Sequence, residues 1–300
     1  MTEAEMKSLL ISVESKELTR DEEKNIPGEF VDLPSGRTHF EVRGAGSSVV
    51  LVHGYATPYY IYDKLFENFI KAGYRVLRYD LLGRGYSERV RADYTPELFA
   101  RQLDEISAHV FGAEPFYLVG TSMGGTITAA FTSLHPDRVK KLVLLAPAGM
   151  DTFEPPMYMK LCKIPVLGSF IFKNVAGKML LKRAASELYH VPESENDYYT
   201  RSFAAAAAYK GFLDCTLSSL RHTILETKAA TDRYKVVGES GLPVLCIWGT
   251  ADKTMPYYQH ERLLRVVPQV ELITYEGSGH IFLFDEGDRT ASDILDFFKK

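Results

Sequence analysis

The chain has 300 residues, of which 46% are hydrophobic and 25% charged, a composition typical of a globular protein long enough to bury a sizeable core. Its formal net charge is −4 and no long basic stripe occurs, so we expect no nucleic-acid partner. Three cysteines, Cys162, Cys215 and Cys246, are odd in number and lack metal-ligand spacing, which predicts reduced thiols and no metal site.

Residues 1–27 are predicted to form an N-terminal extension or a helix, two alternatives that the loose spacing of their apolar residues leaves open. The segment is rich in acidic residues and lacks a sustained apolar run, so it does not resemble a secretory signal. No apolar run in the chain approaches the roughly 20 residues needed to span a bilayer. We therefore expect a soluble, cytoplasmic protein.

Two strands are predicted over residues 28–33 and 37–43, because Pro34-Ser35-Gly36 between them is typical of a turn. From Ser48 onward the chain alternates between strands and helices. Val49–Val52 is apolar throughout, as expected for a strand buried on both faces of a parallel sheet. The further elements expected before Gly149 are helices at 59–71 and 95–109 and strands at 75–79, 116–119 and 141–145.

The alternation stops after Gly149 and resumes near Leu242. The residues between show helical periodicities, including 202–220, without a convincing buried strand. One interrupted α/β domain fits this pattern better than two consecutive domains. We therefore predict an α/β core with a mostly parallel sheet of about eight strands and one helical insertion. The predicted boundaries are 28–149 and 238–300 for the core and 150–237 for the insertion. The resumed elements are strands at 242–248 and 270–275 and helices at 257–266 and 290–298.

The segment Gly120-Thr121-Ser122-Met123-Gly124 joins a predicted strand to a predicted helix. Its Gly-x-Ser-x-Gly pattern is that of a nucleophile elbow, a strained turn that exposes one serine hydroxyl above the sheet edge. The glycines leave room where such a turn brings neighbouring backbone close. Taken alone, the pattern also fits a serine in an ordinary glycine-rich turn, so the rest of the chain must decide.

A serine nucleophile needs a base that takes its proton, and the base needs an acid that orients it. Asp252 follows the predicted strand 242–248, and His280 follows the strand 270–275. Ser122, Asp252 and His280 therefore follow strands that end at the same edge of a parallel sheet, where open α/β sheets bind ligands. Taken singly, Asp252 is also a candidate cap for the helix near Pro256, and His280 fits an ordinary surface loop.

Two further polar residues follow predicted strands. Asp80 is a weaker candidate for the acid, and a structural role in its loop is favoured for His53. Attack on a carbonyl also creates an oxyanion that requires N–H donors. The backbone N–H groups of Met123 and Tyr55 are the predicted oxyanion hole, one directly after the nucleophile and one in the loop after Val49–Val52.

Taken together, these segments resemble the α/β-hydrolase superfamily, and the resemblance covers almost everything after residue 28. It rests on the order and spacing of five segments: His53-Gly54, the loop 80–87, Gly120–Gly125, Gly249–Asp252 with Pro256, and Gly277–His280. The resemblance implies that the insertion at 150–237 is a cap over the active site. It also implies a serine hydrolase that requires no cofactor.

Within that superfamily the residues favour a carboxylic-ester hydrolase that acts through an acyl-enzyme. Ser122 stands where dehalogenases and epoxide hydrolases carry aspartate, and the His53-Gly54-Tyr55 loop lacks the His-Gly-Gly-Pro-Gly of proline iminopeptidases. Thr121 and Ile281 stand where carbon–carbon bond hydrolases usually show asparagine and tryptophan. The run Ser122–Gly125 is shared with monoacylglycerol lipases and small-ester hydrolases. The alternatives are a carbon–carbon (vinylogous diketone) hydrolase, an aminopeptidase-like amide hydrolase, or a small-molecule receptor of the same fold.

Apolar residues in the insertion favour an apolar acyl group, so the predicted partner is a small ester or lipid-like molecule. Lysines interleave with these residues, which raises the hypothesis that the cap contacts a membrane. Packing of the same residues onto the core is the favoured interpretation. The sequence leaves open whether the protein is a monomer or a dimer. The apolar residues in question include Met157, Tyr158, Met159, Leu161, Val166, Leu167, Phe170, Ile171, Phe172, Met179, Leu180 and Leu181, and the basic ones are Lys173, Lys178, Lys182 and Arg183.

Overall fold

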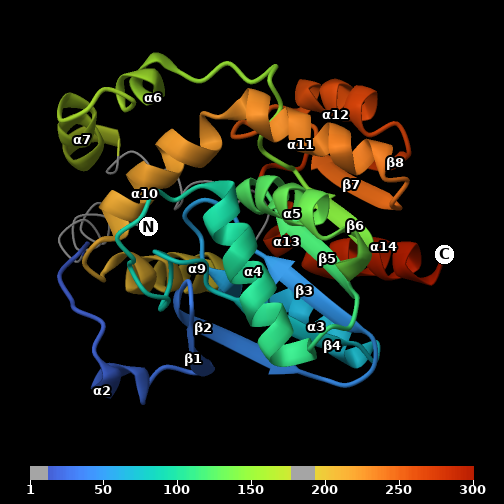
Figure 1. Cartoon of the computed structure of the whole chain (residues 1–300), viewed down its shortest axis with the longest axis horizontal. Helices are drawn as coiled ribbons and strands as arrows, with labels where there is room; N and C mark the ends of the chain where they lie inside the picture. The colour runs from blue at the N-terminus through green and yellow to red at the C-terminus, as the bar shows by residue number, and fades with distance from the viewer. Residues whose placement is uncertain (1–12, 177–192) are drawn as a thin grey trace.

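The computed structural model describes residues 13–176 and 193–300. Eight strands form one sheet in the order β1-β2-β4-β3-β5-β6-β7-β8 (Figure 1). This confirms the predicted mostly parallel sheet of about eight strands. The strands are β1 (Glu29–Leu33), β2 (Gly36–Arg43), β3 (Ser48–Val52), β4 (Arg75–Tyr79), β5 (Phe116–Thr121), β6 (Val139–Leu145), β7 (Val244–Gly249) and β8 (Val270–Tyr275).

The first two strands are the antiparallel part of the sheet. β1 and β2 form a hairpin in which Leu33 lies opposite Gly36, and β2 runs antiparallel to β4. All pairs from β4 through β3 to β8 are parallel. The parallel strands are joined by helices, as connections between parallel neighbours require. Their carboxyl ends therefore lie at one edge.

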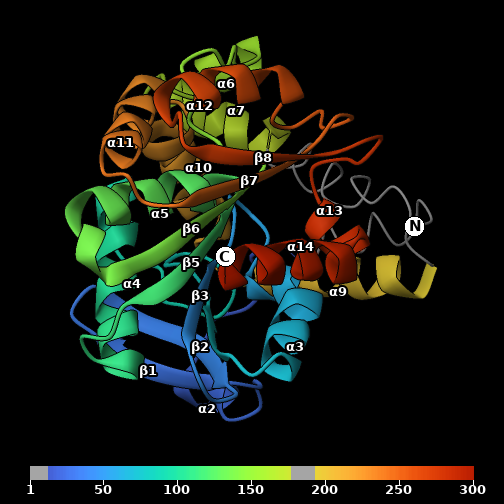
Figure 2. The same ribbon diagram turned by 90° about the vertical axis from the view of Figure 1, so that its right-hand side faces the viewer.

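Helices cover both faces of the sheet (Figure 2). On one face α4 (Pro96–Phe111) and α11 (Thr227–Glu239) pack against α5 (Met123–Leu134), and on the other α3 (Asp63–Lys71) packs against α14 (Gly287–Lys299). All five residues of β3 are buried, which explains their continuous apolar run. The remaining elements of this part are α12 (His260–Val266), α13 (Phe282–Asp285) and the 3₁₀ turns Tyr59–Tyr62, Pro136–Arg138 and Tyr257–Gln259.

Between β6 and β7 the described residues form helices and no named strand. In Figure 1 the first of these helices gather at the end of the molecule opposite the C-terminus. The predicted helical stretch 202–220 is interrupted, because Gly211 adopts a φ of 88° and the carbonyls of Ala207 and Ala208 accept hydrogen bonds from Glu14 and Lys16. The helices are α6 (Met157–Leu161), α7 (Leu167–Ile171), a π-helical turn Phe172–Ala176, α9 (Glu193–Ala207), α10 (Phe212–Ser219) and a π-helical turn Leu220–Ile224.

The N-terminal segment from residue 13 onward is attached to this helical insertion. Lys16 forms a bridge with Tyr209, between α9 and α10. A short helix, α2 (Arg20–Glu23), follows and begins at a capping box formed by Thr19 and Glu22. Residues 1–12 of the predicted extension lie outside the described residues. The extension is thus bound to the insertion through Glu14 and Lys16 and to the β1–β2 hairpin through α2, where Glu23 pairs with Arg37.

The predicted boundaries of the core and the insertion stay a prediction. α11 includes the predicted boundary at residue 237. Because α11 packs against α5, it belongs to the helical layer that covers the sheet. No helix of the described residues is both long enough and apolar enough to span a membrane.

Candidate active site

Ser122 occupies a strained turn between β5 and α5. Its φ of 53° and ψ of −120° belong to a region that residues with a side chain rarely adopt, at a cost of about 1–3 kcal/mol. Neighbouring backbone holds it there. The N–H of Ser122 donates to Leu145 at 2.9 Å, and its carbonyl accepts from Gly125 and Ala148, each at 2.9 Å. The strain is therefore imposed by β6 and by the loop that follows it.

The glycines around Ser122 are required by close backbone approach. A Cβ on Gly120 would clash with the carbonyl of Gly124, and a Cβ on Gly124 would clash with the carbonyl of Val52. A Cβ on Gly54 would lie 3.2 Å from the Cβ of Ser122. The structure therefore confirms the steric reason for the glycine pattern, and it brings the loop after β3 against the serine.

Asp252 and His280 lie in contact. His280 Nδ1 is 2.7 Å from one Asp252 carboxylate oxygen, Oδ2. The other oxygen, Oδ1, accepts the backbone N–H groups of Thr254 and Met255, each at 2.8 Å. Asp252 thus fixes its own turn and orients the imidazole, but it does not cap the helix near Pro256, whose N-cap is Pro256 itself without a side-chain hydrogen bond. An Nδ1–H donated to the carboxylate leaves Nε2 as the nitrogen that accepts a proton.

The sheet order places these residues at one edge. Ser122 follows β5, Asp252 follows β7 and His280 follows β8, and β5, β6, β7 and β8 are adjacent parallel strands. Ser122 and Asp252 are buried, and the side chain of His280 is 11% exposed. The carboxyl edge of such a sheet is its usual ligand site.

The two predicted oxyanion donors belong to segments that meet at Ser122. Met123 is the first residue of α5, so its N–H is one of the unpaired donors at a helix N-terminus, which favours negative charge. Tyr55 follows Gly54, the residue that approaches the serine. The Tyr55 hydroxyl donates to the carbonyl of Thr216 in α10 at 2.9 Å. The loop after β3 is therefore tied to the helical insertion.

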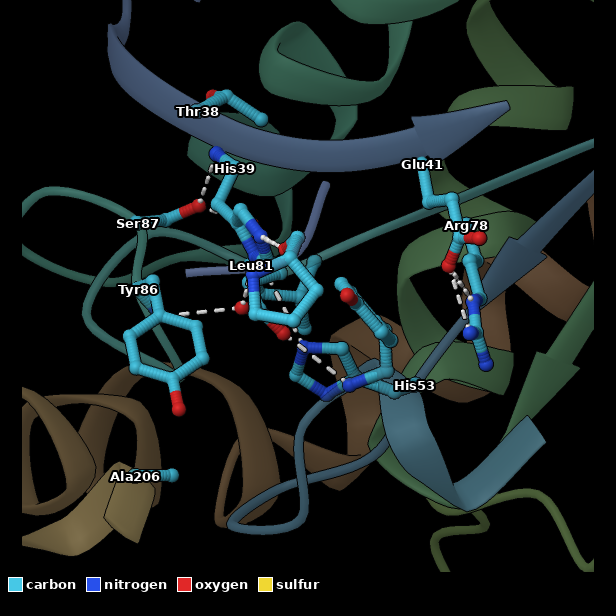
Figure 3. A network of polar contacts seen from close by, with 12 residues as sticks. Thr38, His39, Glu41, His53, Arg78, Leu81, Tyr86, Ser87 and Ala206 are labelled. Carbon is cyan, nitrogen blue, oxygen red and sulfur yellow. Dashed lines mark hydrogen bonds and ion pairs between the residues drawn. The ribbon is translucent and has the colours of Figure 1, made fainter. Parts of the chain in front are cut away.

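His39 and Tyr86 belong to a buried polar network that surrounds Asp80 (Figure 3). Its Oδ2 is 2.8 Å from His39 Nδ1 and accepts the Tyr86 N–H at 2.9 Å, while its Oδ1 accepts the Tyr59 N–H at 3.1 Å. His39 Nε2 lies 2.8 Å from the carbonyl of Pro27. Both ring nitrogens of His39 therefore face oxygen atoms, and the imidazole joins Asp80 to the backbone at Pro27.

Sequence reasoning missed His39. The antiparallel register of β2 on β4 places Phe40 opposite Tyr79, so His39 lies beside the strand end at Asp80. Only that register would have revealed the pair, and no local pattern encodes it. Asp80, the weaker candidate for the triad acid, thus has a different histidine as its partner.

His53 has the structural role that the sequence favoured. Its Nε2 accepts the Leu81 N–H at 2.9 Å, and its Nδ1 faces the carbonyl of Gly54 at 3.0 Å (Figure 3). The ring is therefore neutral with its proton on Nδ1. Complete burial lowers its pKa to about 4. His53 links the loop after β4 to the loop that contains Tyr55.

The burial of neutral His53 predicts acid sensitivity. The unfolded chain binds a proton at His53 below its ordinary pKa of 6.5, whereas the folded chain does not until about pH 4, so stability falls as the pH drops through this window. We expect the free energy of unfolding, measured with urea, to fall between pH 7.5 and pH 4.5 in both proteins. The fall should be about 2–3 kcal/mol smaller in His53→Gln than in the wild type. His109→Gln, at an exposed histidine, is the control. An equal loss in wild type and His53→Gln would contradict the prediction.

A family model described as serine aminopeptidase, S33, matches residues 45–287, which contain all five predicted site residues. The chain belongs to this S33 family. It is a hydrolase of the α/β-hydrolase superfamily, as the resemblance implied. Among the residues that the structure describes, no cluster of His, Cys, Asp and Glu is arranged to hold a metal ion.

Relatives of this S33 family member differ in the reactions that their names give. A 2-hydroxy-6-oxononadienedioate/2-hydroxy-6-oxononatrienedioate hydrolase from Cupriavidus pinatubonensis is 28% identical over 89% of this chain and 94% of its own length. Lipase 1 of Psychrobacter immobilis is 25% identical over 84% of this chain and 77% of its own length. An esterase from Exiguobacterium antarcticum has a similar fold, with a TM-score of 0.76, 20% identity, and coverage of 91% and 100% of the two chains. Family membership therefore leaves the scissile bond open.

Proposed function

We propose that the protein cleaves carboxylic esters through an acyl-enzyme formed on Ser122. The observation that carries this proposal is the 2.7 Å contact of Asp252 with His280 at the same sheet edge as the strained serine. A carboxylate on Nδ1 keeps Nε2 free of its proton and stabilises the imidazolium once it forms. A scaffold or receptor of the same fold has no need for such a pair.

The proposed reaction begins when Ser122 Oγ attacks the ester carbonyl carbon and His280 Nε2 takes the hydroxyl proton. The N–H groups of Met123 and Tyr55 donate to the resulting oxyanion. Collapse breaks the bond to the alcohol, which leaves with the proton from His280. Water then attacks the acyl-enzyme while His280 accepts its proton, and collapse releases the acid and restores Ser122.

We propose further that the acyl group of the ester substrate is apolar. The insertion supplies apolar side chains, of which Cys162 and Phe172 are buried, whereas Val166 and Phe170 on and beside α7 are 84% and 66% exposed. Two lysines of this segment are engaged in ion pairs within the insertion, Lys163 with Glu226 and Lys173 with Asp214. The hypothesis of membrane contact stays a prediction, and Met179, Leu180, Leu181, Lys178, Lys182 and Arg183 lie outside the described residues.

Carbon–carbon bond cleavage is the second candidate, and the 28% identical relative named as a 2-hydroxy-6-oxononadienedioate/2-hydroxy-6-oxononatrienedioate hydrolase favours it. Both reactions use a serine, a histidine and an acid, so only the substrate separates them. Thr121 and Ile281, which replace the asparagine and tryptophan usual in that class, favour the ester.

A substrate panel tests the choice. We expect kcat/KM for p-nitrophenyl esters with acyl chains of increasing length to exceed that for a p-nitroanilide and for a vinylogous diketone by about 100-fold or more, because the activated alcohol is the better leaving group and the cap is apolar. A higher kcat/KM for the diketone would overturn the ester proposal. A fluorophosphonate probe should label Ser122 if the protein hydrolyses esters, amides or carbon–carbon bonds. In a receptor without catalytic activity the serine should not react.

A further inference from the structure

Arg84 is a buried cation that the proposed mechanism does not use. It lies in the loop after β4 and its side chain is fully buried. Among the described residues no carboxylate lies within ion-pair distance of its guanidinium, and burial lowers its pKa. A buried charge without a counter-ion is costly unless its donors are satisfied by other groups. Its contacts therefore indicate what it does.

The guanidinium of Arg84 joins three backbone segments. Nε donates to the carbonyl of Tyr55 at 2.9 Å, and Nη1 lies 3.4 Å from the carbonyls of Leu82 and of Cys215 in α10. Nη2 has no hydrogen-bond partner in the part of the chain that the structure describes. The rings of Tyr55, Tyr94 and Phe99 lie around the guanidinium at 5.7–5.8 Å from its carbon. The charge is thus held by carbonyl dipoles and aromatic faces.

Tyr55 is attached to α10 in two ways. Its hydroxyl donates to Thr216, and its carbonyl is bridged to Cys215 by Arg84. The N–H and the C=O of Tyr55 lie in adjacent peptide planes that meet at its Cα, so anchoring both the carbonyl and the side chain leaves the N–H less freedom to turn. The proposed oxyanion donor is therefore held by a residue that also contacts the cap.

We propose that Arg84 is a positioning residue that fixes the Tyr55 N–H in the oxyanion hole and links the position of this N–H to the position of α10. The inference rests on the proposed function, because it needs Tyr55 as an oxyanion donor. A guanidinium or an ammonium group can donate to the Tyr55 carbonyl from this position, whereas an apolar side chain cannot. By holding an oxyanion donor, Arg84 acts on the transition state more than on substrate binding.

Arg89 provides a matched control. It lies in the same loop and also has no carboxylate within ion-pair distance among the described residues. Its Nη1 donates to the carbonyl of Ser87 at 2.7 Å, Nη2 lies 3.5 Å from the carbonyl of Ala206 in α9, and its guanidinium faces the ring of Tyr209. Arg89 therefore attaches the same loop to the insertion without contacting Tyr55.

The kinetic test compares Arg84→Met, Arg84→Lys and Arg89→Met. Active-site titration corrects each rate for the fraction of competent enzyme. We expect Arg84→Met to lower kcat for the best p-nitrophenyl ester about 100-fold with KM within about threefold, because a displaced donor weakens the transition state. Arg84→Lys should recover part of the loss by restoring a donor to the Tyr55 carbonyl, and Arg89→Met should stay within about threefold of the wild type.

The second readout is binding of a trifluoromethyl ketone, which forms a tetrahedral oxyanion adduct with a reactive serine. Arg84→Met should weaken its inhibition by the same factor as kcat/KM, while inhibition by the carboxylic acid product changes little. If Arg84 had a purely structural role, Arg84→Met would lower the titrated active fraction. The remaining active enzyme would keep its kcat/KM and its inhibition constant for the ketone. That result would overturn the inference.

Amide hydrogen exchange separates this inference from the proposed function. We expect Arg84→Met to raise exchange about tenfold in peptides covering 53–57 and α10, and Arg89→Met to raise it in α9 instead. A wild type that reacts with neither ester nor ketone refutes the proposed function, and the exchange result then still decides whether Arg84 couples the two segments. Unchanged exchange in either segment would refute the coupling.

Discussion

Ser122→Ala is expected to lower kcat for a p-nitrophenyl ester by about 10⁴- to 10⁶-fold, because removal of the nucleophile leaves only the oxyanion hole and substrate binding. The fold should be retained, since alanine occupies the same volume as serine without its hydroxyl. The measurement is steady-state turnover together with fluorophosphonate labelling, which should vanish. Turnover within about tenfold of the wild type would remove Ser122 from the proposed role.

The strained backbone at Ser122 adds a stability readout to the same experiment. Because φ is 53° and ψ is −120°, glycine fits this position better than alanine or serine. We expect Ser122→Gly to unfold at a higher urea concentration than Ser122→Ala, by about 1 kcal/mol, although both are inactive. Thr121→Val is the control, because it removes the neighbouring hydroxyl that donates to Leu145 at 3.2 Å and leaves the nucleophile in place. Its kcat should stay within about tenfold of the wild type.

The parts of this site that the sequence predicts are those encoded by local patterns. Val49–Val52 is a strand because it is apolar throughout, and Gly120 and Gly124 mark the elbow because only glycine avoids the backbone beside it. Ser122, Asp252 and His280 each follow a strand that the sequence indicates. Parallel strands bring such ends to one edge, so the contact of Asp252 with His280 follows from the fold class.

The parts that escaped prediction depend on contacts between distant segments. His39 and Asp80 are 41 positions apart, and only the register of β2 on β4 brings them together. The break between α9 and α10 depends on hydrogen bonds from the segment around Lys16, which no periodicity within 202–220 reveals. Arg84 stands out because it is buried and has no carboxylate within ion-pair distance among the described residues. Both features belong to the folded chain and leave no local pattern in the sequence.

Asp80→Asn is expected to lower the free energy of unfolding by about 2–3 kcal/mol, because the NH₂ group of asparagine cannot accept the hydrogen bonds that the buried carboxylate oxygen accepts. One oxygen of this carboxylate accepts the Tyr59 N–H and the other accepts the Tyr86 N–H. Urea unfolding at pH 7 is the measurement. A loss below about 1 kcal/mol would contradict this role of the buried carboxylate.

The difference in unfolding free energy between the wild type and Asp80→Asn should depend on pH, and this dependence tests the charge of Asp80. Burial raises the pKa of Asp80, but the hydrogen bond and the charge of His39 outweigh it and hold the pKa below its ordinary value of 3.8. A carboxyl with a lowered folded pKa contributes stability above its unfolded pKa and loses it as the pH falls through the folded pKa. The part of the gap between wild type and Asp80→Asn that depends on the Asp80 charge should therefore be lost as the pH falls below about 4. The double variant His39→Gln/Asp80→Asn should be less destabilised than the sum of the single variants, because each single variant already breaks the contact between these two side chains; additive losses would contradict a direct interaction.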